Sequence, residues 1–222
     1  MCIRDRFVFF RLFNAKQWHP YSAVLIGAVV LTSLLLVTTL VHFDRFNHGD
    51  GPLPADIAFY GWVGIYALAP FWIAGLYALN SRHDPGASGT EPLVSEGVRR
   101  AAAVGGGVAF VVAALFLLWP DGVIDAWPWT LTPLTARVLG SYVATIATLG
   151  LVLSRDARWS SWKVIVETLL FFFAFLLVGA LRAFDDFDEG NVLTWVYLAA
   201  PLGAGAALLW LRRSMQAQRA SI

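Results

Sequence analysis

Histidine and aspartate residues gather directly after the first long apolar segment of the sequence. His42, Asp44 and His48 stand there in the pattern H-x-D-x(3)-H. Imidazole and carboxylate groups are ligands that zinc and manganese accept. A zinc site needs three or four such groups, and either Asp50 or the later pair Asp185 and Asp186 could complete one. The spacing matches no established metal motif, so we interpret the stretch as a polar loop and predict neither a metal nor another cofactor.

Two arginines, Arg137 and Arg182, fall at the ends of apolar segments. An ionisable group at membrane depth is costly, so it usually has a partner or faces water. Asp125, Asp185 and Asp186 are candidate partners. The last two follow Arg182 at helical spacing if that helix continues far enough. In the simpler alternative, each guanidinium extends to the lipid headgroups.

Glu167 is the only carboxylate clearly inside an apolar segment. Lys163 precedes it by four residues, which places both side chains on one face of a helix, near its end. We favour an ion pair at the membrane boundary. The alternative is a carboxylate that relays protons.

The sequence contains no recognisable catalytic motif. Gly105-Gly106-Gly107 is not followed by the GK[ST] of a phosphate-binding loop, and G-x-S-x-G, H-E-x-x-H and C-x-x-C do not occur. The single cysteine, Cys2, excludes an intrachain disulfide. The net charge of +1 gives no basic field for nucleic acid, so we expect no nucleic-acid partner. Whether the protein is an enzyme stays open, and we assign no catalytic residue.

The elements that must position these residues are long apolar segments. The chain has 222 residues, of which 58% are hydrophobic and only 14% charged, whereas a soluble domain carries about a quarter charged residues. An apolar stretch of about 20 residues spans the hydrocarbon core as a helix. Six stretches have this length: 21–43, 57–79, 101–119, 134–153, 164–184 and 192–211. The sequence therefore predicts an all-α, polytopic transmembrane bundle in contact with a lipid bilayer.

The distribution of Lys and Arg between the connections predicts the orientation. Thirteen of these residues fall on the side of the two termini: Arg4, Arg6, Arg11, Lys16, Arg82, Arg99, Arg100, Arg155, Arg158, Lys163, Arg212, Arg213 and Arg219. Three fall on the other side: Arg45, Arg137 and Arg182. We therefore expect cytoplasmic N- and C-termini, with residues 1–20 as an arm, 21–213 as the membrane domain and 214–222 as a tail.

The first and fifth apolar segments resemble each other, which predicts a parallel internal repeat. Trp18 precedes the first segment and Trp159 the fifth, and each lies 25 residues before a Phe-Asp pair, Phe43-Asp44 and Phe184-Asp185. Each segment is followed by a second one with a Trp near its start and a Pro inside: Trp62 with Pro70, and Trp195 with Pro201. Parallel repeats occur in several transporter folds.

Two expectations about the N-terminus follow from this repeat and from the first residues. Met1 to Arg6 look like a translated linker rather than native sequence. If the last four segments form one unit, the first two are half of another unit, whose first half would lie upstream. Residues 7–13 would then be the end of a lost helix.

Two motifs carry a resemblance to known proteins. The run W-P-W-x-L-T-P-L-T-A-R covers 127–137, and H-F-D-R-F covers 42–46. Together they resemble a group of uncharacterised bacterial polytopic membrane proteins, over most of the chain. The resemblance implies the bacterial plasma membrane as the location. It implies no activity, substrate or catalytic residue.

Three classes of function remain. A transporter or permease-like protein is weakly favoured, because of the repeat and the prolines inside two segments. The alternatives are a membrane-embedded enzyme with an outer-face site and a structural or accessory subunit, which would pack in a homo-oligomer or with other membrane subunits. In either of the first two classes, Arg137, Arg182, Asp44 and Asp185 should converge on one cavity.

Overall fold

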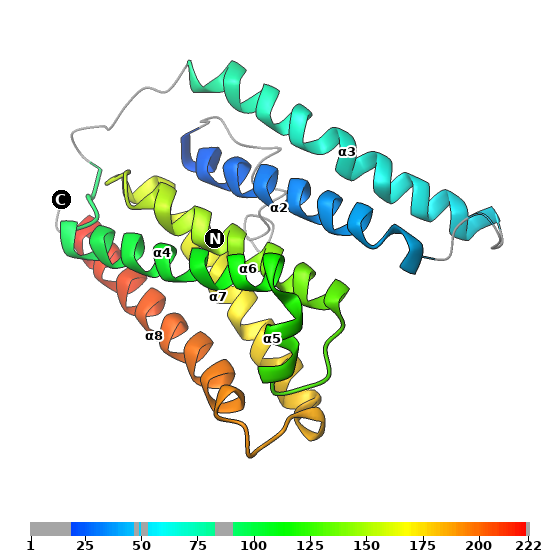
Figure 1. Ribbon diagram of the computed structural model, residues 1–222. Helices are drawn as coiled ribbons and strands as arrows, with labels where there is room; N and C mark the ends of the chain where they lie inside the picture. The colour runs from blue at the N-terminus through cyan, green and yellow to red at the C-terminus, as the bar shows by residue number, and fades with distance from the viewer. Residues whose placement is uncertain (1–18, 47–48, 50–52, 83–90, 221–222) are drawn as a thin grey trace.

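The protein is an all-α membrane bundle, as the sequence predicts. The computed structural model describes residues 19–46, 49, 53–82 and 91–220 (Figure 1). In these residues the chain forms seven α-helices, six of which are long and apolar enough to span a membrane. The helices are α2 Ser22–Val41, α3 Leu53–Ser81, α4 Glu96–Leu118, α5 Pro120–Ala126, α6 Pro133–Leu153, α7 Trp159–Arg182 and α8 Val192–Ala220.

Local signals place the starts of two central helices. α4 begins after Ser95, whose hydroxyl accepts a hydrogen bond from the Val98 N–H at 3.5 Å. α6 begins with Pro133 in its first turn and a capping box between Thr132 and Thr135. The cap satisfies N–H groups that the first turn of a helix leaves without partners.

The helices differ from the predicted segments in three places. α3 and α8 have 29 residues each, and α8 continues through the predicted tail to Ala220. Pro70 and Pro201 lie inside these helices, and neither interrupts its helix. The short helix α5 occupies the predicted connection before α6. Hydrophobicity locates the lipid-embedded part of a helix, whereas the helix itself ends where its backbone hydrogen bonds end.

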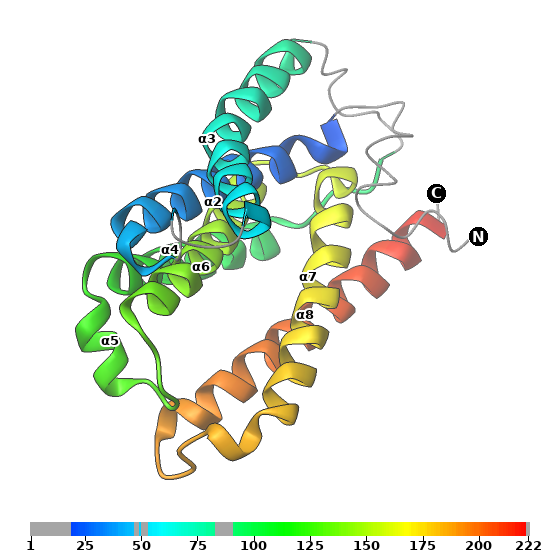
Figure 2. The ribbon, with the colours of Figure 1, turned by 90° about the vertical axis from the view of Figure 1, so that its right-hand side faces the viewer.

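Four helices lie side by side in the order α3, α2, α6 and α4, and the α7–α8 hairpin crosses beside them at an angle (Figures 1 and 2). α4 and α6 pack the most closely, through glycines. A Cβ on Gly140 would lie 2.7 Å from the Phe116 Cβ, and a Cβ on Gly106 would lie 3.0 Å from the Ala147 carbonyl oxygen. Glycine permits this approach because it has no side chain to separate the two backbones.

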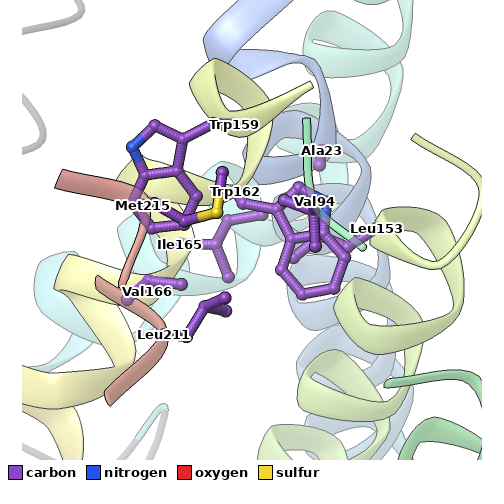
Figure 3. Packing of buried hydrophobic residues seen from close by; sticks show 9 residues of the cluster. All are labelled: Ala23, Val94, Leu153, Trp159, Trp162, Ile165, Val166, Leu211 and Met215. Atoms are coloured by element: carbon purple, nitrogen blue, oxygen red, sulfur yellow. The ribbon is translucent and has the colours of Figure 1, made fainter. Parts of the chain in front are cut away.

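The main apolar core lies where the chain segments before α4 and α7 meet α8. Its centre is formed by Trp159, Trp162 and Ile165 of α7 together with Leu211 and Met215 of α8 (Figure 3). Val94, Leu153 and Ala23 complete it from the segment before α4, from α6 and from α2. This end of the bundle is the end at which the arginine-rich connections lie.

The α2–α3 and α7–α8 hairpins have the same turn after their first helix, which supports the predicted repeat. α2 is followed by the 3-10 helix η3, Phe43–Arg45, and α7 by η4, Phe184–Asp186. The residues that link helix and turn have similar torsions, with φ −114° and ψ 28° at His42 and φ −109° and ψ 24° at Ala183. Two equal turns at matching positions indicate that the sequence similarity extends to the backbone.

Aromatic residues fix both turns to the second helix of their hairpin. Phe43 and Phe46 each have ring centroids 5.3 Å from that of Phe59 on α3. Phe184 lies 6.5 Å from Trp195, at the start of α8. The Phe-x-x-Phe pattern therefore serves the same packing role in each copy.

The two copies also meet each other. His19, in the 3-10 helix η2 (His19–Tyr21) before α2, has its Nε2 atom 2.6 Å from the Ser160 Oγ in the first turn of α7. These two residues are 141 positions apart, which is also the separation of Phe43 and Phe184. The contact therefore joins two residues at equivalent positions of the predicted repeat.

Candidate functional site

Arg137 connects three helices at the end of the bundle away from the arginine-rich connections. It is the fifth residue of α6 and is half-buried. Its Nε donates a hydrogen bond to the Leu117 carbonyl oxygen of α4 at 3.2 Å, and its Nη1 lies 2.8 Å from the Nε2 of His42 at the end of α2. The guanidinium is thus engaged by α4 and α2 at the same time.

The contact with α4 satisfies a carbonyl group at the C-terminal end of that helix. Leu117 is among the last four residues of its helix, whose carbonyls lack intrahelical partners. A cation there satisfies a free acceptor and interacts favourably with the helix dipole. Arg137 is therefore a C-terminal cap of α4, a role that sequence spacing could not reveal because the two residues lie on different helices.

The contact with His42 fixes the state of the imidazole ring. A guanidinium has only donors, so the His42 Nε2 must accept, and the ring must be neutral with its proton on Nδ1. Burial and the nearby Arg137 charge lower the pKa of His42 below its ordinary value, against the opposing effect of Asp44. The lowered pKa of His42 agrees with the neutral ring that the hydrogen bond from Arg137 requires.

The remaining predicted outer-face residues do not join this pair. Asp44 is about 80% exposed and Arg45 about 74%, with 3.9 Å between the Asp44 Oδ2 and the Arg45 Nε. Four further candidates are exposed: Asp125, Arg182, Asp185 and Asp186. His48 lies outside the described residues. Among the residues that the structure describes, no three His, Cys, Asp or Glu side chains are grouped so as to hold a metal ion.

The helical spacing considered for Arg182 does not arise. α7 ends at Arg182, and Asp185 and Asp186 belong to η4 rather than to a continued helix. Within the described ranges, no carboxylate lies within 4.0 Å of the Arg182 guanidinium. The exposed side chain fits the alternative in which it extends towards the headgroups.

Glu167 has an ion-pair partner on the neighbouring helix. The Nη2 of Arg212 on α8 lies 3.6 Å from the Glu167 Oε1, and the Glu167 side chain is 17% exposed. The sequence spacing pointed to Lys163 on the same helix. A partner from α8 could be recognised only once the α7–α8 hairpin was known.

A second polar cluster, which sequence reasoning missed, surrounds Asp156 between α6 and α7. Its carboxylate accepts hydrogen bonds from the Arg158 N–H at 2.9 Å, the Arg158 Nη2 at 2.9 Å and the Ser161 Oγ at 2.7 Å. The Trp162 Nε1 donates to the Asp156 carbonyl oxygen at 2.7 Å. Burial alone would raise the pKa of Asp156, but the hydrogen bonds from Arg158 and Ser161 lower it. The sequence offered one signal, an Asp three residues before the start of a helix whose first turn is rich in Ser and Trp.

The same cluster connects α4 to α7. The Val94 N–H donates to the Ala157 carbonyl oxygen at 2.8 Å, and the Ser160 N–H donates to the Glu91 Oε1 at 2.7 Å. The segment before α4 is thereby aligned antiparallel to the segment before α7, with Leu93 paired to Arg158. Its position beside the main apolar core indicates a structural function for this cluster.

Aromatic residues form a third group, between α5, α6 and α8. Trp129 lies 4.9 Å from Trp127, 4.9 Å from Tyr197 and 4.7 Å from Phe187, measured between ring centroids. The Asp188 N–H donates to the Pro128 carbonyl oxygen at 2.7 Å and holds the η4 loop against them. The rings contact one another directly, so the W-P-W motif forms a packed cluster.

Comparisons with known proteins find no matching family model, no similar curated protein and no similar solved structure. The fold and its surface define the class. The protein is a multi-pass integral membrane protein whose apolar helices contact the lipid bilayer.

Proposed function

We propose that this protein is a structural or accessory subunit of a membrane assembly. The observation that carries the proposal is the separation of the polar side chains that a site would need to bring together. Arg137 is engaged in capping α4 and in binding His42, while Arg182, Asp44 and Asp185 are exposed. Polar groups at this end thus hold helices together or face solvent.

Transport, the function that the sequence weakly favoured, has less support. Transporters of repeat architecture bind their substrates where a membrane helix is broken and its backbone is exposed. Here the helices that contain Pro70 and Pro201 are continuous. Glu167, the carboxylate within a span, is paired with Arg212. The predicted parallel repeat is the feature that still favours transport.

An outer-face enzyme is the other alternative. The His42–Arg137 pair is the only candidate histidine contact at this end among the described residues, and the imidazole there accepts from a cation. A general base needs a lone pair directed at a substrate proton. The Nε2 lone pair of His42 is already occupied by Arg137.

We propose cytoplasmic termini and the bacterial plasma membrane as the setting. The imbalance of Lys and Arg between the two ends supports the orientation, and the resemblance of the two sequence motifs to bacterial membrane proteins supports the location. Labelling of single cysteines at Ser95 and Asp185 in intact cells tests the orientation. We expect an impermeant reagent to modify Asp185→Cys only, and the reverse pattern would refute the orientation.

The proposed function is tested by isolating the protein with its native lipids. A tagged chain is extracted from its own membrane into polymer-bounded lipid discs, and the composition is measured by native mass spectrometry. We expect a fixed stoichiometry with a second membrane protein or with further copies of this chain. A monomer that moves a solute across vesicle membranes after reconstitution would contradict the proposal and favour transport.

A further inference from the structure

The contact between His42 and Arg137 depends on the protonation state of one ring. Arg137 donates to the His42 Nε2 at 2.8 Å, and the same guanidinium holds the end of α4 through Leu117. A protonated imidazole has no acceptor, so the hydrogen bond cannot form with the charged ring. Two cations would then face each other at this distance, and their repulsion adds to the loss of the bond.

We propose that the His42–Arg137 pair is a pH-responsive latch, which holds the end of α2 against α4 and α6 when His42 is neutral and releases it when His42 is protonated. The proposal goes beyond an accessory function and does not depend on it. The released element would be the end of α2 with the η3 turn. The aromatic contacts of Phe43 and Phe46 with Phe59 do not involve His42, so they keep this turn attached to α3.

The charges around His42 define the direction of the effect. Among the described residues, Arg137 of α6 opposes protonation, and so does Arg45 of η3, while Asp44 of η3 favours it. α3 also packs against α2, but none of its charged groups acts on the ring. α4 contributes a carbonyl, which binds Arg137 rather than His42. The lowered pKa of His42 means that the latch stays closed at neutral pH and opens in acid.

His42 follows directly after the apolar span of α2, which ends at Val41. His42 is half-buried and Asp44 beside it is exposed, so protons reach the ring from the aqueous phase. A hydrogen bond to a charged group contributes about 1.5 kcal/mol, which corresponds to about a tenfold change in the opening equilibrium.

The latch is tested by hydrogen exchange of the full chain in lipid nanodiscs at pH 7.5 and 5.0, corrected for the intrinsic exchange rate. We expect the amides of 38–46 to exchange about tenfold faster at the lower pH. His42→Gln places an amide oxygen close to the Nε2 position and cannot titrate, so its protection should be the same at both pH values. Absence of an acid response in the wild type, or the same response in His42→Gln, would overturn the proposal.

The other three histidines provide matched controls: His19, His48 and His83. Their glutamine variants should retain the acid response, and a response that disappears with His48→Gln would assign the effect to that residue and refute the latch. A second measurement does not depend on the folding of His42→Gln. In the triple variant that keeps only His42, nitrogen NMR should show an unprotonated Nε2 at pH 7.5 and a pKa below the ordinary value, and a protonated Nε2 at pH 7.5 would refute the proposal.

Discussion

The row of α3, α2, α6 and α4 and the α7–α8 hairpin are held together by different means. In the row, backbones approach each other at glycines, and a Cβ on Gly27 would lie 2.9 Å from the Leu149 side chain. The hairpin contacts the rest of the bundle chiefly at its two ends, through the Asp156 cluster with the main core and through the aromatic group around Trp129. Between these ends the hairpin exposes large side chains such as Phe175, which is 74% exposed.

The difference shows two ways to assemble helices in a solvent that is itself apolar. Lipid tails provide little hydrophobic drive for helix association, so close packing at small residues and hydrogen bonds between polar groups must provide it. Within the row, α2, α6 and α4 use the first means, whereas a Cβ on the α3 glycines Gly61, Gly64 and Gly75 would have nothing within 4 Å. The α7–α8 hairpin uses hydrogen bonds at its ends, from Ser161 to Asp156 at one end and from the Asp188 N–H to the Pro128 carbonyl oxygen at the other. Substitutions at the two kinds of contact should therefore lower the free energy of unfolding by different amounts, and the losses should depend differently on pH.

The largest effect is expected at Gly140, in the contact between α4 and α6. A leucine there would overlap the Phe116 side chain, and overpacking of this kind costs about 3 kcal/mol. We expect Gly140→Leu to lower the free energy of unfolding by that amount, as measured by denaturation in mixed micelles. Gly105→Leu is the matched control, because nothing lies within 4 Å of a Cβ at Gly105. Equal losses in both variants would refute the account of glycine packing.

The Asp156 cluster should give the next largest effect. Asp156→Ala removes the acceptor of the hydrogen bonds from the half-buried Arg158 and the buried Ser161. We expect a loss of about 2 kcal/mol, with faster exchange at the start of α7. Asp185→Ala, at an exposed carboxylate of the opposite end, should change stability little. A stable Asp156→Ala variant would mean that apolar packing alone anchors the hairpin.

The same carboxylate should make stability depend on acid pH. The pKa of Asp156 is lower in the folded protein than in the unfolded chain, because the Arg158 and Ser161 hydrogen bonds outweigh the effect of burial. Its contribution is present above the unfolded value of about 3.9 and is lost as the pH falls through the folded pKa. We expect the acid-side decline of the unfolding midpoint to be shallower in Asp156→Asn. An unchanged decline would assign the acid dependence to other carboxylates.

A smaller effect is expected inside the hairpin. Glu167→Gln removes the charge that pairs with Arg212, whose side chain is 38% exposed, so screening limits the loss to about 0.5 kcal/mol. Unfolding of this variant is compared with that of Lys163→Gln, which changes the other basic residue near Glu167. A larger loss in Lys163→Gln would show that the partner on the same helix is the stronger one.

The two outer arginines should give the most informative contrast. Arg182→Ala removes an exposed side chain and should change the free energy of unfolding by less than about 0.5 kcal/mol. Arg137→Ala removes the cap of α4 and the partner of His42, so a loss of about 1.5 kcal/mol is expected. Both variants are measured in the same micelles. Similar losses would mean that the position at the membrane boundary, rather than the contacts, determines the effect.

The fold could be predicted largely from the sequence, whereas the contacts could not. Six apolar segments and the Trp-to-Phe spacing predicted the helices and the repeat, and the structure has both the helices and the matching turns η3 and η4. Arg212 of the neighbouring helix was not foreseen as a partner of Glu167, and Asp156 was not singled out. Spacing along one helix indicates which residues share a face, but the partner of a side chain on another helix depends on how the helices cross.

Hydrophobic length and the positions of charge determined that six helices of the described residues are long and apolar enough to span a membrane, because a bilayer accepts only uncharged, internally hydrogen-bonded segments. The tertiary structure decided which of two similar arginines is engaged. Arg137 meets a carbonyl of the last turn of α4 and an imidazole because α2 and α4 end where α6 begins, while the side chain of Arg182, at the end of α7, is exposed. That convergence is a property of packing, and the sequence of a single helix does not contain it.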